Sequence, residues 1–261
     1  MTNSKKGNLP MTSGMQLSKA QSPTTPEGKE RMSRVPYASA IGSIMYAMIC
    51  TRPDVTYALS MTSRYQGNPG ETHWIAVKNI LKYLRRTKDW VLTYGGDTKL
   101  CATGYADASF QTDRDDSKSQ SGFVFTLNGA AVSWKSSKQS VVADSTTESE
   151  YYAASEAAKE AIWMRQFLQG LTVVPSSHDP ITIYCDNRGT IFQAKEPKSS
   201  SKSRHVHRKA HLIRDYVEQE EIVLDKIVSD DNIADPLTKP LRCDKHEGHV
   251  ISMGIKRVPK L

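Results

Sequence analysis

Cysteine is scarce in this chain, and the four that occur, Cys50, Cys101, Cys185 and Cys243, lie far apart. Their spacing contains no Cys-x-x-Cys pair, which argues against a disulfide framework. The sequence also lacks an apolar run of membrane-spanning length, and its N-terminus has no apolar signal core. We therefore expect a soluble intracellular protein, cytoplasmic or nuclear, with reduced cysteines and no membrane partner.

Acidic residues are outnumbered by basic ones, so that the formal net charge of the 261 residues is +7. A basic balance is consistent with a nucleic-acid partner, although many basic proteins bind none. The length fits one large domain or two of ordinary size.

The composition changes along the chain and predicts four regions. Residues 1–33 are rich in Ser, Thr, Lys, Gly and Pro and predict an extended or disordered tail. Residues 34–95 carry apolar residues at helical spacing and predict a small helical module. Residues 96–245 mix strand and helix patterns and predict an α/β domain, whereas residues 246–261 show no clear element and predict a C-terminal tail.

The α/β region predicts three antiparallel strands, then a long helix, a fourth strand, two helices, a fifth strand and a short last helix. Such an order favours one mixed five-stranded sheet flanked by helices, in which the helical crossover makes the first and fourth strands parallel neighbours. In chain order the elements are expected at residues 100–110, 122–127, 130–136, 147–169, 181–186, 188–194, 204–220, 222–228 and 231–241.

Two of these strands each carry one acid, Asp107 in the first and Asp186 at the end of the fourth. A carboxylate within a strand is costly unless a cation or a hydrogen-bond donor accompanies it. Each acid also has an ordinary structural explanation, since Asp107 fits an exposed strand end and Asp186 fits a helix N-cap or turn. Parallel pairing of the two strands would bring both carboxylates to one edge of the sheet.

Two further acids are candidates for the same site. From Glu150, steps of three and four residues along the long helix meet small and apolar side chains, so Glu150 faces the sheet. The same walk from Glu148 meets polar residues, so Glu148 faces solvent near the helix N-terminus. Asp235 precedes Pro236 and on local grounds is better explained as a helix cap.

A cluster of three or four carboxylates would repel itself unless cations were bound within it. Hard oxygen ligands favour Mg²⁺ or Mn²⁺ over zinc. Two such ions would suit in-line phosphoryl transfer.

Several longer motifs surround these acids, namely YADASF, SGFVFTLNGAAVSWKSSKQ, STTESEYYAASEAAKEAIWMR, YCDNRGTI, SRHVHRKAHLIRDYV and NIADPLTKPL. Together they resemble the ribonuclease H domain of copia-type LTR retrotransposon polyproteins. The upstream motifs LSKAQSPTTPEGKERM, VPYASAIGSIMYAMICTRPDVTYALS and NPGETHWIAVKNILKYLRRT resemble the end of the reverse transcriptase, its thumb and connection. The resemblance covers most of residues 8–255 and rests on the combination and spacing of the motifs.

The resemblance implies a ribonuclease H-like fold after a thumb- or connection-like module, and a catalytic and metal-binding set of Asp107, Glu150, Asp186 and Asp235. Its pattern of Glu, a bulky residue, any residue and Ala matches Glu150 to Ala153. In that set Asp107 and Asp186 would bridge two Mg²⁺ or Mn²⁺ ions, Glu150 would bind one ion and orient the 2′-hydroxyl of RNA, and Asp235 would complete the second position.

The chain departs from the family pattern in two places. Many ribonucleases H carry a histidine loop before the last helix, but here that connection, residues 229–232, has none. His205, His207 and His211 on the preceding helix are candidates to replace it, although a structural or phosphate-contacting role explains them better. The reverse transcriptase palm is missing, so no polymerase activity is expected.

These observations predict a ribonuclease H-type endonuclease that cuts the RNA strand of RNA–DNA hybrids, with other parts of the polyprotein as further partners and a virus-like particle or the nucleus as its place. The alternative is an inactive retroelement remnant that at most binds nucleic acid. Candidates for backbone contact, equally well explained as solvated surface, are Lys135, Lys138, Lys202, Arg204 and Arg208.

Overall fold

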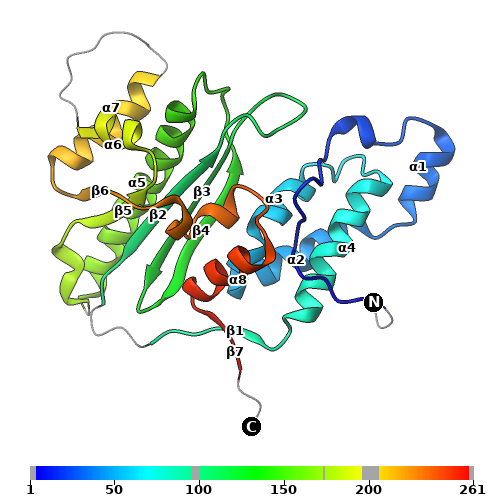
Figure 1. Ribbon diagram of the computed structural model, residues 1–261, viewed down its shortest axis with the longest axis horizontal. Coiled ribbons are helices and arrows are strands. Elements are labelled where there is room, and N and C mark those ends of the chain that lie inside the picture. Colours follow the sequence, from blue (N-terminus) through cyan, green and yellow to red (C-terminus); the bar gives the residue numbers. More distant parts are fainter. Residues whose placement is uncertain (1–3, 96–99, 173, 196–205, 259–261) are drawn as a thin grey trace.

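A computed structural model describes residues 4–95, 100–172, 174–195 and 206–258, with the backbone alone for residues 206–211. Its main layer is a five-stranded sheet in the order β4-β3-β2-β5-β6 (Figure 1). The predicted α/β fold, a mixed five-stranded sheet flanked by helices, is therefore confirmed. The strands are β2 (Thr103–Ser109), β3 (Gln120–Leu127), β4 (Ala130–Lys138), β5 (Ile181–Cys185) and β6 (Ile222–Lys226).

The sheet is antiparallel on one side of β2 and parallel on the other. β2, β3 and β4 form a meander that turns at Asn128 and Gly129, both with positive φ, as the hairpin signal predicts. β5 pairs parallel with β2, and Ala106 lies opposite Cys185 at the end of the ladder. Asp107 and Asp186 each follow these paired residues directly, so the register brings both acids to the same edge.

The long helix α5 (Thr146–Leu171) crosses one face of the sheet (Figure 1). Ser145 caps it by accepting a hydrogen bond from the Glu148 N–H. The helix continues through Gly170, where the sequence suggested its end, and stops at Thr172 in the left-handed region. The small side chains Ala154, Ala157, Ala158 and Ala161 allow the helix axis to approach β2 and β3 closely.

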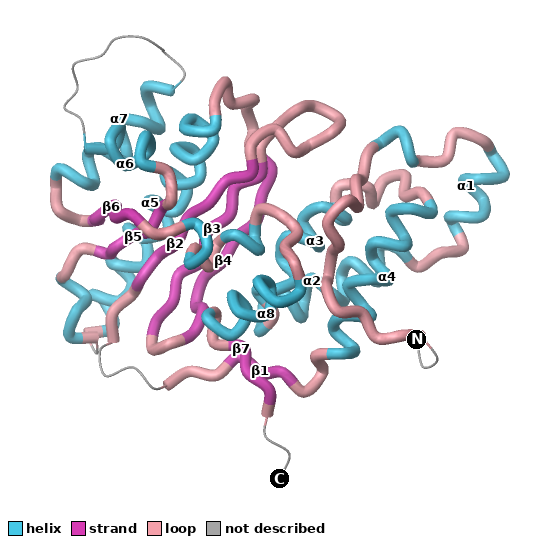
Figure 2. The backbone as a smooth tube through the Cα atoms, in the orientation of Figure 1, coloured by secondary structure: helices cyan, strands magenta, loops and turns pink. Residues whose placement is uncertain are grey.

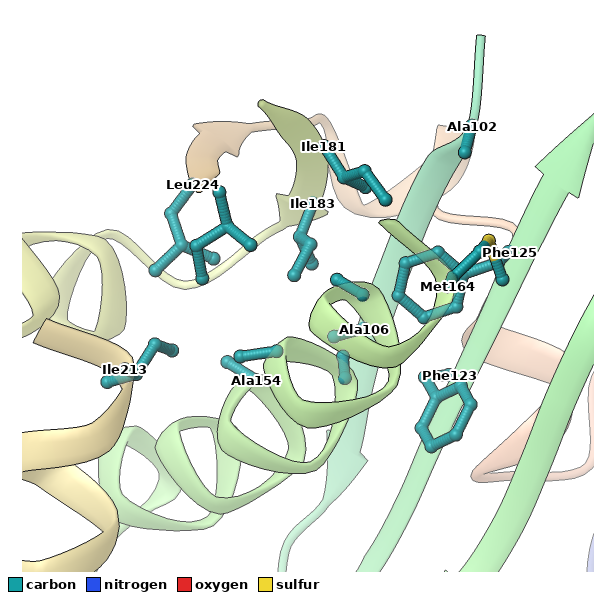
Figure 3. Packing of buried hydrophobic residues seen from close by; sticks show 14 of the residues in the cluster. Ala102, Ala106, Phe123, Phe125, Ala154, Met164, Ile181, Ile183, Ile213 and Leu224 are labelled. Carbon is teal, nitrogen blue, oxygen red and sulfur yellow. The ribbon is translucent and has the colours of Figure 1, made fainter. Parts of the chain in front are cut away.

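The core between α5 and the sheet is shown in Figure 3, where Met164 of α5 lies beside Phe125 of β3, and Ala154 lies on the side of the helix towards Ile213. Burial of these side chains is the main stabilising contribution to this layer. Two shorter helices, α6 (Arg188–Lys195) and α7 (Val206–Glu218), complete the same face beside β6.

The N-terminal part is a helical module with its own core, as predicted. Its helices are α1 (Pro26–Ser33), α2 (Tyr37–Thr51), α3 (Thr56–Ser63) and α4 (Glu71–Arg86). Short 3-10 turns lie at Lys19–Gln21 (η1) and Pro53–Val55 (η2). A buried ion pair joins Arg52 Nη2 to Asp54 Oδ2 at 2.7 Å, and the Tyr83 hydroxyl donates to the same oxygen at 2.7 Å. The domain boundary at residue 95 stays a prediction.

The described part of the N-terminal 33 residues is not the extended tail that the sequence suggested. Met11 and Leu17 are only 3% exposed and belong to the core of the helical module, and residues 26–33 form α1. The prediction failed because these apolar residues are isolated within a polar stretch and show no period. A few buried contacts nevertheless order the segment against α4.

The C-terminal end also differs from the prediction. The last helix expected at residues 231–241 is replaced by two short 3-10 turns, η4 (Ser229–Asp231) and η5 (Asp235–Leu237), because Pro236 and Pro240 interrupt a regular helix. The expected C-terminal tail instead forms α8 (Cys243–Ser252) and β7 (Ile255–Arg257). β7 pairs with β1 (Trp90–Leu92), so segments far apart in sequence lie side by side (Figure 2).

The η5 turn packs on the face of the sheet opposite α5. Leu237 belongs to a buried cluster with Val124 of β3 and Met253. Gly122 of β3 permits this approach, because a Cβ atom built on it would lie 2.8 Å from Leu237 Cβ. The turn that carries Asp235 is thereby held against the strand next to Asp107.

Candidate metal centre

Asp107 lies in β2, directly after the last residue that pairs with β5, and is 1% exposed. Its Oδ2 accepts a hydrogen bond from the Thr238 hydroxyl and lies 4.0 Å from Lys239 Nζ. Burial, together with the charges of Asp235 and Asp186, raises the pKa of Asp107 to about 7, although Lys239 and the Thr238 hydroxyl oppose the shift. The sequence also allowed Asp107 to be an ordinary exposed acid at a strand end. Because the residue is buried, that explanation is wrong.

Glu150 lies near the start of α5, faces the same sheet edge and is 7% exposed. Burial and the charges of Asp107 and Asp186 raise its pKa well above the usual value, although a backbone hydrogen bond from Ala108 opposes the shift. Its Oε2 is buried and has no hydrogen-bond partner among the described residues. Glu148, by contrast, accepts a hydrogen bond from the Asp144 N–H at 2.7 Å, so the predicted difference between the two glutamates is confirmed.

Asp186 follows the last residue of β5 and is half-buried. The helix α6 is capped by its neighbour, because Asn187 Oδ1 accepts a hydrogen bond from the Thr190 N–H at 3.0 Å. Asp186 is thus not required as a cap. One ligand atom each of Glu150, Cys185 and Asp186 lies within 4.8 Å of the others.

Asp235 opens η5 and is fully buried. Its Oδ1 lies 2.9 Å from Lys239 Nζ, and its Oδ2 lies 2.9 Å from Lys245 Nζ. The buried Asn232 fixes the preceding turn, since its side-chain nitrogen donates to Ala106 O at 2.9 Å. Asp235 makes no side-chain cap of its turn, so the helix-cap explanation that local sequence favoured is wrong.

The four carboxylates come from β2, α5, the end of β5 and η5, and together they are suited to hard divalent cations. The unpartnered Glu150 Oε2 is a buried oxygen that a cation would satisfy. Cys185 is the exception in the set, because burial and the neighbouring acids raise the pKa of its thiol. A protonated thiol is a poor ligand for Mg²⁺, so the carboxylates fit such an ion and Cys185 belongs to the core.

The structure describes the side chains of only some of the basic residues predicted to contact phosphate. Lys135 Nζ lies 3.3 Å from Glu156, and Lys138 Nζ lies within 3.2 Å of Asp113 and Asp116, so both are already paired with acids. Lys202, Arg204 and His205 lie outside the described residues. Arg208, His207 and His211 lie on α7, and their side chains are likewise outside the described part.

Sequence reasoning missed the polar residues that surround the acids, namely Asn232, Thr238, Lys239 and Lys245. A spacing of four residues between Asp235 and Lys239 is a local signal that was available. The contacts of the other three depend on the path of η5 and α8, which the sequence pattern did not reveal.

The fold and the site define an α/β protein with a buried carboxylate cluster at one edge of a mixed sheet. The chain is 43% identical, over 247 residues, to the retrovirus-related Pol polyprotein of transposon TNT 1-94 from Nicotiana tabacum, covering 95% of this chain and 18% of that protein. It therefore belongs to the retrovirus-related Pol polyproteins of transposons and spans about a fifth of that relative's length.

A second relative covers about half of the chain. This relative is secreted RxLR effector protein 161 from Plasmopara viticola. This chain is 47% identical to it over 135 residues, which cover 51% of this chain and 94% of that protein. No family model matches the chain.

Among solved structures, the LC11 RNase H1 complex with an RNA/DNA hybrid matches 52% of this chain and 93% of that one. The sequence identity is 17% and the TM-score is 0.39, so this likeness carries no information about activity. Within the described residues, every helix is too short or too polar to cross a membrane.

Proposed function

We propose that this chain is a ribonuclease H-type endonuclease of a copia-type retrotransposon, which hydrolyses the RNA strand of RNA–DNA hybrids with two Mg²⁺ or Mn²⁺ ions. The supporting observation is that the four acids matched by the family motifs, distant in sequence, converge at one sheet edge. Membership of the Pol polyprotein family makes a nucleic-acid substrate the natural one.

In this proposal Asp107 and Asp186, which the parallel register brings to the same sheet edge, would both help to hold the ions. Glu150 contributes its unpartnered Oε2 and accepts a hydrogen bond from the 2′-hydroxyl that distinguishes RNA from DNA. Asp235 completes the second position. Bound ions supply an activated water and charge neutralisation at the scissile phosphate.

The substrate surface is proposed to be basic, in keeping with the net charge of +7. The ion pairs of Lys135 and Lys138 must be exchanged before either side chain contacts a phosphate, so we assign them a small contribution. Other parts of the polyprotein are proposed as partners inside the cell, in a virus-like particle or the nucleus.

The test is cleavage of a labelled RNA–DNA hybrid in Mg²⁺ by the wild type, Asp186→Asn and the control Asp225→Asn. Asp225 is an exposed acid on the neighbouring strand β6, outside the cluster. We expect cutting of RNA only in the hybrid, no cutting of single-stranded or double-stranded RNA or DNA, and a loss of about 100-fold or more only in Asp186→Asn.

A folded wild type that cuts nothing in Mg²⁺ or Mn²⁺ would reject the enzyme and leave the inactive remnant. Cutting of other substrates would instead indicate a different nuclease or a phosphatase of the same fold. Mg²⁺ should also raise the melting temperature of the wild type but not of Asp186→Asn.

A further inference from the structure

The carboxylate cluster contains a positive charge that belongs to the protein, the ammonium group of Lys239. Its Nζ lies 2.9 Å from Asp235 Oδ1 and 4.0 Å from Asp107 Oδ2. These two acids are almost fully buried, whereas the lysine side chain is 40% exposed. The ammonium group therefore lies between the buried oxygens and solvent.

The backbone holds Lys239 in this place. Its N–H bonds Asp235 O at 3.2 Å, and the preceding Thr238 hydroxyl donates to Asp107 Oδ2. Pro240 follows and restricts the chain beyond the turn. The ammonium thus reaches the cluster from a fixed turn, and its charge also influences Asp186 and Glu150.

We propose that Lys239 is a resident counter-cation, which neutralises the cluster in the metal-free protein and must leave Asp235 and Asp107 when a divalent cation binds. This inference rests on the proposed metal site. An ammonium and a divalent cation compete for the same carboxylate oxygens, and their positive charges repel each other at close range. The half-exposed, flexible lysine stem gives the ammonium a short route into water.

Lys245 offers a matched comparison, because it also pairs with Asp235. It approaches the other oxygen, Oδ2, and shares its charge with the exposed Asp230 at 3.0 Å. Its electrostatic partners are those two acids, whereas Lys239 acts on Asp107, Asp186 and Asp235. Within the cluster Lys245 thus pairs with Asp235 alone, whereas Lys239 lies near both Asp235 and Asp107.

The experiment is calorimetric titration of the full chain with Mg²⁺ for the wild type, Lys239→Met, Lys239→Arg and Lys245→Met. We expect Lys239→Met to bind Mg²⁺ about tenfold more tightly, Lys239→Arg to resemble the wild type, and Lys245→Met to change by less than about threefold. In EDTA, Lys239→Met should melt below the wild type, and saturating Mg²⁺ should remove this difference.

Equal or weaker Mg²⁺ binding by Lys239→Met than by the wild type would overturn the proposed counter-cation role of Lys239. Equally tighter binding by Lys239→Met and Lys245→Met would also overturn it, because it would indicate only an effect of net charge. Absence of Mg²⁺ binding in every variant, wild type included, would instead reject the proposed metal site and this inference with it. Should Lys239→Met fail to fold in EDTA, Lys239→Gln is measured in its place.

Discussion

Replacing Asp107 by asparagine measures the electrostatic cost of the metal-free cluster. The carboxyl is 1% exposed, and its pKa is raised from 3.8 to about 7 by burial and neighbouring acids. Because the folded state holds this proton more tightly than the unfolded chain, the stability it contributes is complete below pH 3.8 and is lost as the pH rises to about 7. At about 1.4 kcal/mol per pH unit, the loss amounts to about 4 kcal/mol.

Asparagine has no such proton to lose, and the Thr238 hydroxyl can still donate to its amide oxygen. We expect the unfolding free energy of Asp107→Asn, relative to the wild type, to grow by about 3 kcal/mol between about pH 4.5 and pH 8. Urea unfolding in EDTA across this range measures the difference, with the exposed Asp225→Asn as a flat control. A difference that is constant with pH, or that falls as pH rises, would refute the reasoning.

Three further substitutions test the close approach of η5 to the sheet and the buried ion pair of the helical module. Gly122→Ala places a methyl group 2.8 Å from Leu237 Cβ and should cost about 1–3 kcal/mol in urea unfolding, together with weaker Mg²⁺ binding. Gly170→Ala, on α5 with no atom within 4 Å of the new methyl group, should be neutral or slightly stabilising, and equal stability of the two variants would contradict the close approach. Arg52→Met leaves the carboxylate of Asp54 buried without its cation and should cost about 3–5 kcal/mol, whereas a cost below about 1 kcal/mol would show that solvent reaches the pair.

The sheet and the three acids Asp107, Glu150 and Asp186 followed from patterns that are local in the sequence. Alternating strands with one acid each, joined by a helical crossover, determine a parallel pair, and the register then aligns Asp107 with Asp186. The small-residue face of α5 fixes the direction of Glu150 because helical periodicity is rigid.

Other features depended on contacts between distant segments. Asp235 was assigned by family resemblance, because its local sequence predicts only a helix cap, and its burial comes from the packing of η5 on Gly122. Met11 and Leu17 are buried by α4 and its neighbours. Their burial could not be predicted, because the apolar residues of that stretch show no periodicity. Lys239 and Lys245 meet the acids only because η5 and α8 converge on the same sheet edge.

Anomalous diffraction from crystals soaked in Mn²⁺ tests the central claim most directly. We predict Mn²⁺ peaks coordinated by Asp107, Glu150, Asp186 and Asp235, with Lys239 Nζ moved away from Asp235 Oδ1. Peaks elsewhere, or none at a Mn²⁺ concentration that supports hybrid cleavage, would contradict a metal centre built from these four carboxylates.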